Sequence, residues 1–390
     1  MNGGHKGPCG ISKQTNKCKK SAIGHYNCEV SSKGACRKKV SPTRSIQGLI
    51  HKFEIIIKYY EINPGKVSGA TFKIRQYNRA IAILKRYPSV NIESVEDLKG
   101  HLIKNGIKNP KTSIEKATEY ILTGTVSLAE KALALPQIQS VINLTKIYAV
   151  GPKKALQLYN TYGIVTNADI TKKLTTNPNI ITTKQKIGLH YFADLQTRIP
   201  RKEIDGYQKK FIKIAALIPD IVVSINGSYR RGMRSSGDVD VLITSSNPTK
   251  DPSLLRKKFI AFLVEKGLII EVLASGKTKF MGISKLTKRS KARHIDIIDT
   301  ALEKYPFAQL YFTGSGGFNI HMRALAVNQG YSLNEYSLTH RKTKKPLQPS
   351  EIIAKIGKDS FKNERDIFTF LGMKYLKPEK RNITTSGKVM

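Results

Sequence analysis

The chain has 390 residues, and its 67 Lys and Arg against 28 Asp and Glu give a formal net charge of +39. This excess goes beyond what solubility needs and indicates a polyanionic partner, because each neutralised phosphate releases counterions. The sequence has no apolar run of about 18 residues and no apolar signal core, so we expect neither a membrane span nor secretion. The length suits two to four compact units.

Residues 1–44 are predicted to form a basic tail, because they lack apolar periodicity and are rich in Gly, Ser and Lys. All four cysteines lie in this tail, so disulfides are not expected to build the fold. Six tail residues have side chains of types that bind zinc: His5, Cys9, Cys18, His25, Cys28 and Cys36. Their spacing is wide, without a CxxC pair, so a Zn²⁺ site and an extended basic arm with free thiols both fit.

Three segments with helical periodicity predict a short helical domain over residues 45–131. They are IQGLIHKFEIIIKYYEI, ATFKIRQYNRAIAILKRYP and TSIEKATEYILTG. Residues 132–188 then predict two helices around a tight turn that contains Gly151 and Pro152. A turn of this kind can present backbone N–H groups to DNA phosphates.

The chain changes character over residues 189–302, where β-rich runs alternate with helical or turn segments. The runs are DIVVSING, DVDVLIT, GLIIEVLA and HIDIID, and they predict a mixed sheet. Residues 303–390 predict a small α+β unit. Helices first and a sheet later indicate an α+β multidomain chain, not one doubly wound domain.

The stretch GSYRRGMRSSGDVDVLIT, residues 227–244, places Asp238 and Asp240 one residue apart at the head of an apolar run. Strand side chains alternate, so both carboxylates should lie on one face. Carboxylates this close repel each other unless a cation lies between them, and Mg²⁺ takes oxygen ligands while keeping positions for phosphate. A D-x-D pair at a strand start is also often a solvated turn, so the pair alone does not establish a metal site.

The loop before these aspartates is built from groups that suit phosphate oxygens. Its N–H groups, hydroxyls and guanidinium groups come from Gly227, Gly232, Gly237, Ser228, Ser235, Ser236, Arg230 and Arg231. A triphosphate beside a metal ion is the simplest interpretation.

A third acidic residue, Asp296 in RHIDII, lies in an apolar run that we expect to form the adjacent strand. It would complete a two-metal site in which one ion activates a hydroxyl and both stabilise charge during phosphoryl displacement. Asp299 is the alternative. Three residues further along a strand, it should face away from Asp296.

In their order, these motifs resemble the X family of DNA polymerases, and most closely its polymerase beta type. The order is G-S-x-x-R-G-x-x-x-S-G-D-x-D, then RHIDI, then YFTGS, FN, MRA and NEY, and the resemblance covers about residues 45–380. It implies a lyase-like domain at 45–131, a helix-hairpin-helix subdomain at 132–188, a catalytic palm at 189–302 and a nucleotide-selection subdomain at 303–390.

The resemblance implies that Asp238, Asp240 and Asp296 bind two Mg²⁺ ions, with Mn²⁺ as an alternative, and that Asp296 accepts the primer hydroxyl proton. The implied nucleotide site consists of Lys186, Gly227, Ser228, Arg231, Ser236, Gly237, Tyr311, Phe312, Gly314 and Asn319. The implied DNA contacts are Lys73, Tyr77, Thr145, Ile147, Val150, Gly151, Lys153, Lys279 and Arg323. A Na⁺ or K⁺ ion would bind the carbonyls of Thr145, Ile147 and Val150.

The segment IEKATEYILTG resembles the lyase helix of the family, which makes Lys116 the expected Schiff-base nucleophile toward an abasic sugar. That role needs a neutral amine. A lysine on an exposed helix is more often only solvated. Lys73 and Tyr77 would bind the 5′-phosphate.

Several positions depart from the family pattern. KNGIKNPKTS lacks the G-x-G of the first hairpin, so its grip on DNA is in doubt. Gly316 stands in place of an acidic residue, and His294 and Ile298 stand in place of arginines. Those side chains help to gate closure in the family, so we expect relaxed fidelity. Catalysis itself needs none of them.

The sequence therefore predicts a DNA-directed DNA polymerase that fills short gaps in base excision repair, with 5′-deoxyribose-phosphate lyase activity. Its expected partners are gapped or nicked duplex DNA and dNTPs, without a membrane, and we expect a monomer. The Lys-, Ile- and Asn-rich composition would suit a large DNA virus, so the expected location is the nucleus, a viral factory or a virion. The alternatives are a template-independent nucleotidyltransferase with the same palm and a DNA-binding scaffold with an inactive palm. The three intact aspartates speak against the scaffold.

Overall fold

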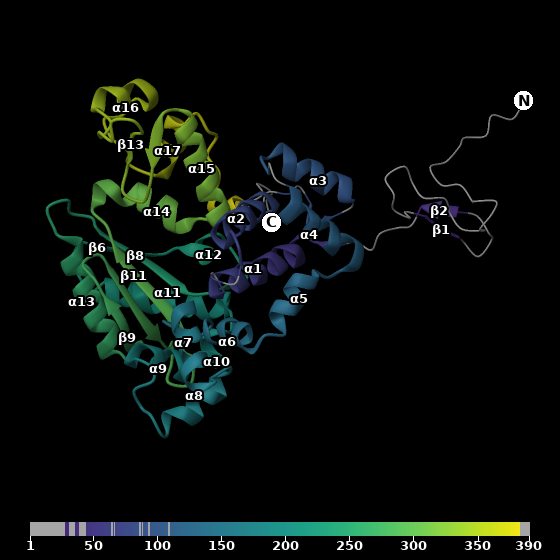
Figure 1. Cartoon of the computed structure of the whole chain (residues 1–390). Coiled ribbons are helices and arrows are strands. Elements are labelled where there is room, and N and C mark those ends of the chain that lie inside the picture. Colours follow the sequence, from purple (N-terminus) through teal and green to yellow (C-terminus); the bar gives the residue numbers. More distant parts are fainter. Residues whose placement is uncertain are drawn as a thin grey trace, which may run out of the picture. The chain divides into compact units, whose positions relative to one another are not determined.

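The computed structural model describes residues 28–30, 36–38, 44–63, 65, 67–85, 87, 89–92, 94–107 and 110–382. The chain divides into two compact units, Met1–Ala132 and Leu133–Met390 (Figure 1). Within the described ranges, no helix is both long and apolar enough to cross a membrane.

In the tail, the short strands β1 (Cys28–Val30) and β2 (Cys36–Lys38) pair antiparallel. The zinc prediction lies outside the described residues, because it depends on the side chains of the tail cysteines and histidines.

The first unit is a small helical domain. Its helices are α1 (Ile46–Ile62), α2 (Ala70–Leu84), α3 (Val95–Lys104), α4 (Pro110–Thr123) and α5 (Ser127–Leu133). Strands β3 (Arg44–Ser45) and β4 (Asn91–Ile92) pair briefly beside them. Ser45 caps α1, because its hydroxyl accepts a hydrogen bond from the Gly48 N–H at 2.9 Å. The apolar face of α1 packs against α2, where the rings of Phe53 and Tyr77 lie 4.9 Å apart.

The second unit begins with five helices around the predicted turn. They are α6 (Pro136–Leu144), α7 (Pro152–Tyr162), α8 (Asn167–Leu174), α9 (Thr183–His190) and α10 (Phe192–Leu195). Pro136 and Pro152 stand in the first turns of α6 and α7, where the missing N–H costs no intrahelical bond. The turn between these two helices contains the predicted Gly151, whereas Pro152, also predicted in the turn, begins α7.

A five-stranded mixed sheet follows, in the order β6 (Ile221–Ile225), β8 (Val239–Ser245), β11 (Arg293–Asp299), β10 (Lys279–Ser284) and β9 (Ile269–Ser275). Strands β8 and β11 are parallel, and the other neighbours are antiparallel. Helices α11 (Arg201–Ala215) and α13 (Pro252–Glu265) contribute side chains to one core with the sheet (Figure 1). The sequence does not predict β10, because its residues KFMGIS include Gly282 and only one β-branched side chain.

Two short elements precede β8, and the last part of the unit follows β11. The former are α12 (Gly227–Arg230) and β7 (Ser235–Ser236), which pairs with β5 (Ile199–Pro200). The latter are η1 (Leu302–Lys304), α14 (Tyr305–Thr313), α15 (Gly316–Asn328), β12 (Tyr331–Leu333), β13 (Leu338–His340), α16 (Pro349–Ile356), α17 (Glu364–Phe370) and η2 (Pro378–Arg381). This part has its own core around Phe318, Met322 and Phe368. The predicted α+β multidomain class is confirmed.

Candidate active site

Three carboxylates come together where the start of β8 lies beside the middle of the parallel strand β11. Asp296 on β11 lies directly beside Asp240 on β8 in the parallel register. Asp238 immediately precedes β8, two residues before Asp240. Because strand side chains alternate, Asp238 and Asp240 share the face that carries Asp296. The sheet therefore brings all three predicted acids to one place.

Burial and mutual repulsion oppose ionisation in this group. Burial raises the pKa of Asp240, and the charges of Asp238 and Asp296 raise it further. Burial also raises the pKa of Asp238, together with the charge of Asp296. A cation placed among these oxygens would relieve both effects.

Lys279 and His294 are the basic groups nearest to Asp296. The Lys279 ammonium lies 2.6 Å from Asp296 Oδ2. His294 Nδ1 lies 3.4 Å from Oδ1, yet Oδ1 is buried and accepts no hydrogen bond from any residue that the structure describes. Across the described ranges, no three His, Cys, Asp or Glu side chains are gathered as a ready-made metal cage. The unpartnered Oδ1 and the excess of carboxylates nevertheless fit divalent cations, which prefer oxygen ligands.

Asp299 lies on the opposite side of β11 from Asp296. It is buried and accepts a hydrogen bond from Arg256, which also donates to the Lys277 carbonyl at 2.8 Å. The Arg256–Asp299 pair is thus a structural ion pair in the palm interior.

Gly227 makes room for the Asp240 carboxylate. A Cβ at residue 227 would overlap Asp240 Oδ2, and the backbone there has φ of +57°. Both conditions require glycine. By contrast, the space beside Gly237 is open, because no atom lies within 4 Å of where its Cβ would stand. A phosphate can approach the Gly237 backbone closely.

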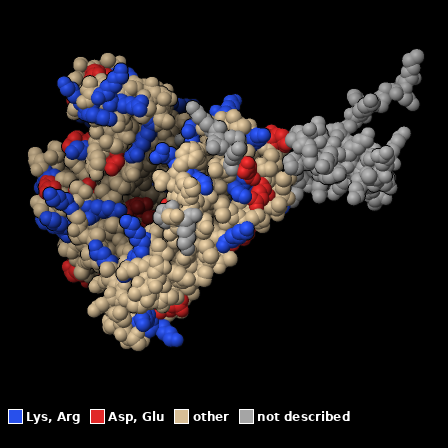
Figure 2. Space-filling model, in the orientation of Figure 1, with Lys and Arg blue, Asp and Glu red and all other residues tan. Residues whose placement is uncertain are grey.

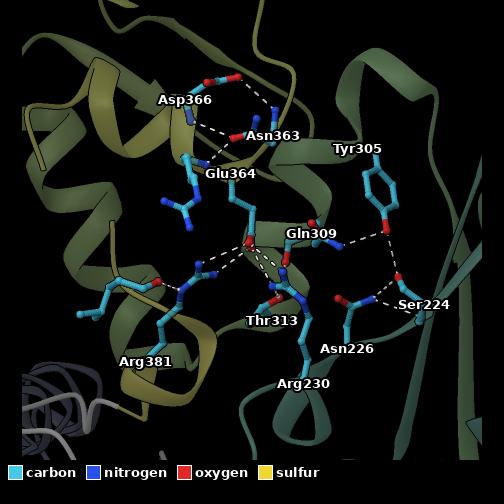
Figure 3. Close-up of polar contacts among 12 residues, drawn as sticks. Ser224, Asn226, Arg230, Tyr305, Gln309, Thr313, Asn363, Glu364, Asp366 and Arg381 are labelled. Atoms are coloured by element: carbon cyan, nitrogen blue, oxygen red, sulfur yellow. Dashed lines mark hydrogen bonds and ion pairs between the residues drawn. The ribbon is translucent and has the colours of Figure 1, made fainter. Parts of the chain in front are cut away.

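The two arginines of the loop are used differently from each other. Arg230 forms a bidentate ion pair with Glu364, at 2.9 and 2.8 Å, and donates to the Thr313 hydroxyl (Figure 3). Arg231 donates from Nε to Asn382 and from Nη1 to the Thr313 carbonyl. The expectation that Arg230 serves phosphate is therefore corrected, since Glu364 occupies its guanidinium.

The three serines of the loop also differ in their hydrogen bonds. The Ser235 hydroxyl accepts a hydrogen bond from Arg198 at 2.8 Å, so it is engaged within the protein. The Ser236 hydroxyl is buried and has no partner among the described residues. Ser228 stands at the first turn of α12, with its carbonyl accepting from the Met233 N–H at 3.1 Å. The buried Ser236 hydroxyl is thus free to bind a ligand, and so is the partly buried Ser228 hydroxyl, which has no hydrogen bond among the described residues.

Tyr311, Phe312, Asn319 and Arg323 form a second predicted cluster, on α14 and α15. The Tyr311 and Phe312 rings meet edge to face at 5.1 Å. Asn319 donates to the Tyr311 carbonyl at 2.8 Å, and the Arg323 guanidinium lies 5.0 Å from the Tyr311 ring centre. Gly314, which ends α14, has φ of +67°, and a Cβ there would lie 3.2 Å from Arg231 Nη1. Gly314 therefore places this cluster beside the phosphate loop.

Two cavities border the helices before the palm. The first, of about 350 Å³, is lined in part by Lys146, Tyr148, Gly237, Asp238 and His294. The second is lined by Lys186 together with residues of α8 and α9, and by neither the aspartates nor the loop. Lys186 thus lines the second cavity and not the one that Gly237 and Asp238 border.

The predicted hairpin residues lie in the turn between α6 and α7. Ile147 and Val150 are buried, and the Val150 N–H donates to the Ile147 carbonyl at 3.1 Å. Gly151 is open, and Lys153 is exposed at the start of α7. The Thr145 hydroxyl donates to the Val141 carbonyl at 2.5 Å. The exposed N-terminus of α7 is therefore available to phosphate.

In the first unit, Lys116 lies on α4 and is one-third exposed. Its ammonium pairs with Glu119 at 2.9 Å. Burial raises the pKa of Glu119, but hydrogen bonds from Ser127 and Lys116 outweigh this and bring it to about 2. Lys116 is thus engaged in an ion pair, whereas the nucleophile role needs an amine that can reach the sugar.

Tyr77 does not lie where its predicted contact with the 5′-phosphate requires. It is only 1% exposed, and its hydroxyl donates to the Thr112 carbonyl at 3.3 Å. The helical periodicity of α2 places Tyr77 on its core face, so it cannot contact a phosphate as it stands. Lys73 on the same helix lies 5.8 Å from the Tyr60 ring centre and is partly exposed.

Sequence analysis missed a group of residues that hold the phosphate loop: Thr313, Glu364, Arg381 and Asn382. Arg381 is fully buried and donates to Glu364 at 2.8 Å and to the Leu376 carbonyl at 2.9 Å (Figure 3). Glu364 stands 134 residues from its partner Arg230. The local sequence gives no signal for Glu364, because two other acidic residues, Asp359 and Asp366, stand close to it.

Three family models match this chain. They are the DNA polymerase beta palm over residues 198–301, the DNA polymerase beta thumb over residues 308–382, and the fingers domain of DNA polymerase lambda over residues 143–196. These matches place β8, β11 and the three aspartates in the palm, and Glu364 and Asn382 in the thumb. The resemblance thus extends from the beta type to the lambda type.

Similar curated proteins include two called DNA polymerase lambda. The one from Arabidopsis thaliana is 28% identical over 83% of this chain and 60% of the relative. The one from Rattus norvegicus is 27% identical over 86% of this chain and 56% of the relative. A DNA nucleotidylexotransferase from Gallus gallus is 24% identical over 94% of this chain and 74% of its own length. This chain therefore spans somewhat more than half the length of the two lambda polymerases.

Proposed function

The chain contains the palm, thumb and fingers domains of the X family of DNA polymerases, and from this premise we propose that it extends a DNA primer into short gaps. One observation carries the proposal: Asp240 and Asp296 are direct neighbours on parallel strands, with Asp238 on the same face. This is the arrangement that phosphoryl transfer between a triphosphate and a hydroxyl requires.

The aspartates would hold two Mg²⁺ ions, or Mn²⁺, which supply charge neutralisation on the phosphates and lower the pKa of the attacking hydroxyl. Asp296 would accept the proton of the primer 3′-hydroxyl, since its Oδ1 has no hydrogen-bond partner within the described part of the chain. Arg231, the Ser236 hydroxyl, and the backbone of Gly227, Ser228 and Gly237 would bind the triphosphate.

The thumb residues would select the nucleotide. Tyr311 and Phe312, with the backbone of Gly314, would crowd the sugar 2′ position and disfavour ribonucleotides. Asn319 and Arg323 would contact the base edge and the template, and both change partners on doing so, because they now hold Tyr311. Lys186 would join the triphosphate only after a rearrangement.

The remaining contacts would bind gapped or nicked duplex DNA. The α6–α7 turn, with Gly151 and Lys153, would bind primer phosphates, and a Na⁺ or K⁺ ion would bind the carbonyls of Thr145, Ile147 and Val150. Lys279 would leave Asp296 for DNA. Gap filling of this kind serves base excision repair. We expect the protein to act as a monomer, in the nucleus or in a viral factory.

The test is extension of a primer across a one-nucleotide gap with Mg²⁺ or Mn²⁺. We expect templated incorporation that Asp296→Asn abolishes. Asp220→Asn should leave it intact, because the Asp220 carboxylate pairs with Lys250 and its carbonyl accepts hydrogen bonds from Ser246, away from the three aspartates. Activity that survives in Asp296→Asn would contradict the assignment. An inactive parent protein that still binds DNA would support the scaffold alternative.

A second candidate function has its own support. The similarity to a DNA nucleotidylexotransferase favours template-independent addition. The same assay distinguishes the two functions when a single-stranded primer is added as a substrate. If that primer is extended as fast as the gapped duplex, the protein adds nucleotides without a template.

We also propose 5′-deoxyribose-phosphate lyase activity, with Lys116 as nucleophile and Lys73 beside the 5′-phosphate. Borohydride should trap a covalent adduct with an incised abasic site in the parent protein but not in Lys116→Ala. Glu119→Gln should speed trapping, because it removes the carboxylate that pairs with the ammonium. An adduct in Lys116→Ala would place the nucleophile elsewhere. Zinc in the tail remains a proposal that metal analysis of the purified protein tests.

A further inference from the structure

Arg231 is held on two edges of its guanidinium group. Nε donates to Asn382 Oδ1 at 2.8 Å, and Nη1 donates to the Thr313 carbonyl at 2.6 Å. Nη2 takes part in no hydrogen bond within the described ranges. Burial lowers the pKa of Arg231, while the charges of Asp240 and Asp238 oppose this. The guanidinium is therefore fixed in direction, with one nitrogen left for a ligand, and the whole group lies within the electrostatic influence of Asp240 and Asp238.

Asn382 holds Arg231 through both ends of its side-chain amide. Besides the contact to Nε, its Nδ2 donates to the Arg231 carbonyl at 3.2 Å and to the Glu379 carbonyl at 3.2 Å. The residue is only 6% exposed. Asn382 thus restrains the backbone and the side chain of Arg231 at once, across 151 positions of sequence.

Asn382 is itself anchored by its neighbour Arg381. The Arg381 guanidinium is shared between Glu364 and the Leu376 carbonyl, and it lies 5.3 Å from the Phe318 ring centre (Figure 3). The Arg381 carbonyl accepts from the Ser315 N–H at 3.2 Å. A residue in such a rigid setting can hold a flexible arginine without losing much freedom itself.

We propose that Asn382 is a positioning residue for the incoming triphosphate, acting through Arg231. This inference rests on the proposed polymerase function. Asn382 and Thr313 hold Arg231 in the conformation that receives phosphate, so the ordering of a long side chain is complete before the nucleotide arrives. A residue that merely fastened the end of the thumb would need the contact with Glu379 but not the contact with Arg231 Nε.

The experiment measures binding of the complementary dNTP to the protein on one-nucleotide-gapped DNA with a dideoxy-terminated primer and Mg²⁺. Asn382→Ala should raise the dNTP Kd about tenfold, the effect of one lost hydrogen bond to a charged group. Its Kd for the DNA should stay unchanged. In extension assays KM should rise while kcat changes by about twofold at most. Asn382→Asp, which keeps an acceptor for Nε, should recover most of the affinity.

Gln329→Ala is the matched control, because it removes one side-chain hydrogen bond within the thumb, to the Leu371 carbonyl at 2.9 Å, far in sequence from the loop. It should leave the dNTP Kd unchanged. A double-mutant cycle sharpens the test: in an Arg231→Ala background, Asn382→Ala should add no further loss. Melting temperatures identify any variant that fails to fold, and Asn382→Leu, which keeps the side-chain volume without an acceptor for Arg231 Nε, then takes the place of the alanine variant.

An unchanged dNTP Kd in Asn382→Ala overturns the inference, as does a loss that adds fully to that of Arg231→Ala. An equal loss in Gln329→Ala also overturns it, since it would mark a general effect of the thumb. These outcomes differ from failure of the proposed function, in which the parent protein itself neither binds the complementary dNTP nor extends the primer.

Discussion

Asp240 occupies its place in the palm because residue 227 has no side chain. In Gly227→Ala the new methyl group would overlap the Asp240 carboxylate, and the backbone would keep a positive φ that costs about 1 kcal/mol or more for alanine. We expect at least about a tenfold loss of primer extension together with a lower melting temperature. Single-turnover extension and thermal melting measure the two effects.

Gly100→Ala serves as the control for that substitution. Gly100 lies inside α3 with no atom within 4 Å of its Cβ position, so alanine should stabilise the helix slightly and leave extension unchanged. Full activity in Gly227→Ala would mean that Asp240 does not need its present position.

Single residues show where sequence reasoning succeeds. Asp238 and Asp240 could be placed on one face from their spacing, and the register with Asp296 follows from the parallel strands. Arg230 and Tyr77 could not be assigned in this way. Arg230 lies in a phosphate-type loop, but a partner 134 residues away uses its charge, and Tyr77 lies on the inner face of an amphipathic helix.

At the scale of elements, α12, α17 and η2 are joined by the Arg230–Glu364–Arg381 triad (Figure 3). Burial raises the pKa of Glu364, but hydrogen bonds and charges from Arg230 and Arg381 outweigh this and hold it below the ordinary 4.5. A lowered pKa means that the triad stabilises the fold fully above pH 4.5 and loses this contribution as the pH falls through the folded pKa.

Glu364→Gln tests the triad. At pH 7 we expect the free energy of unfolding to fall by about 3 kcal/mol, because two largely buried guanidinium groups lose their counter-charge. The difference from the parent protein should shrink below pH 4.5, the ordinary pKa of the carboxyl. Denaturant unfolding at pH 7, 5 and 4 measures it. A difference that stays constant with pH would show that the charge of Glu364 contributes nothing.

Some elements could be predicted from local sequence patterns and others could not. β6, β8, β9 and β11 coincide with apolar runs, whereas β10 carries Gly282 and was not predicted. Asn382 follows a short 3₁₀ turn, and no periodicity points to it. Its importance comes from tertiary contacts with Arg231, which a linear pattern does not contain.

For the whole molecule, charge was the first property that the sequence made predictable. Lys and Arg predominate over acidic side chains across the palm and thumb (Figure 2). Composition gives the sign and size of this excess, but not which cations are already paired. Lys279 and Arg230, for instance, both neutralise carboxylates within the protein.

The excess predicts strongly salt-dependent DNA binding. If six to ten phosphates are contacted, Kd for a gapped duplex should rise about 10³-fold or more between 50 and 200 mM salt. The first 43 residues carry nine Lys and Arg and a single acidic residue, so a variant that begins at Arg44 should show a shallower slope of log Kd against log salt. Its kcat on saturating gapped DNA should equal that of the full chain, because the aspartates and the phosphate loop are untouched. Equal slopes for the two proteins would mean that the tail makes no contact with DNA, and the remaining slope would then belong to the palm, fingers, thumb and helical domain.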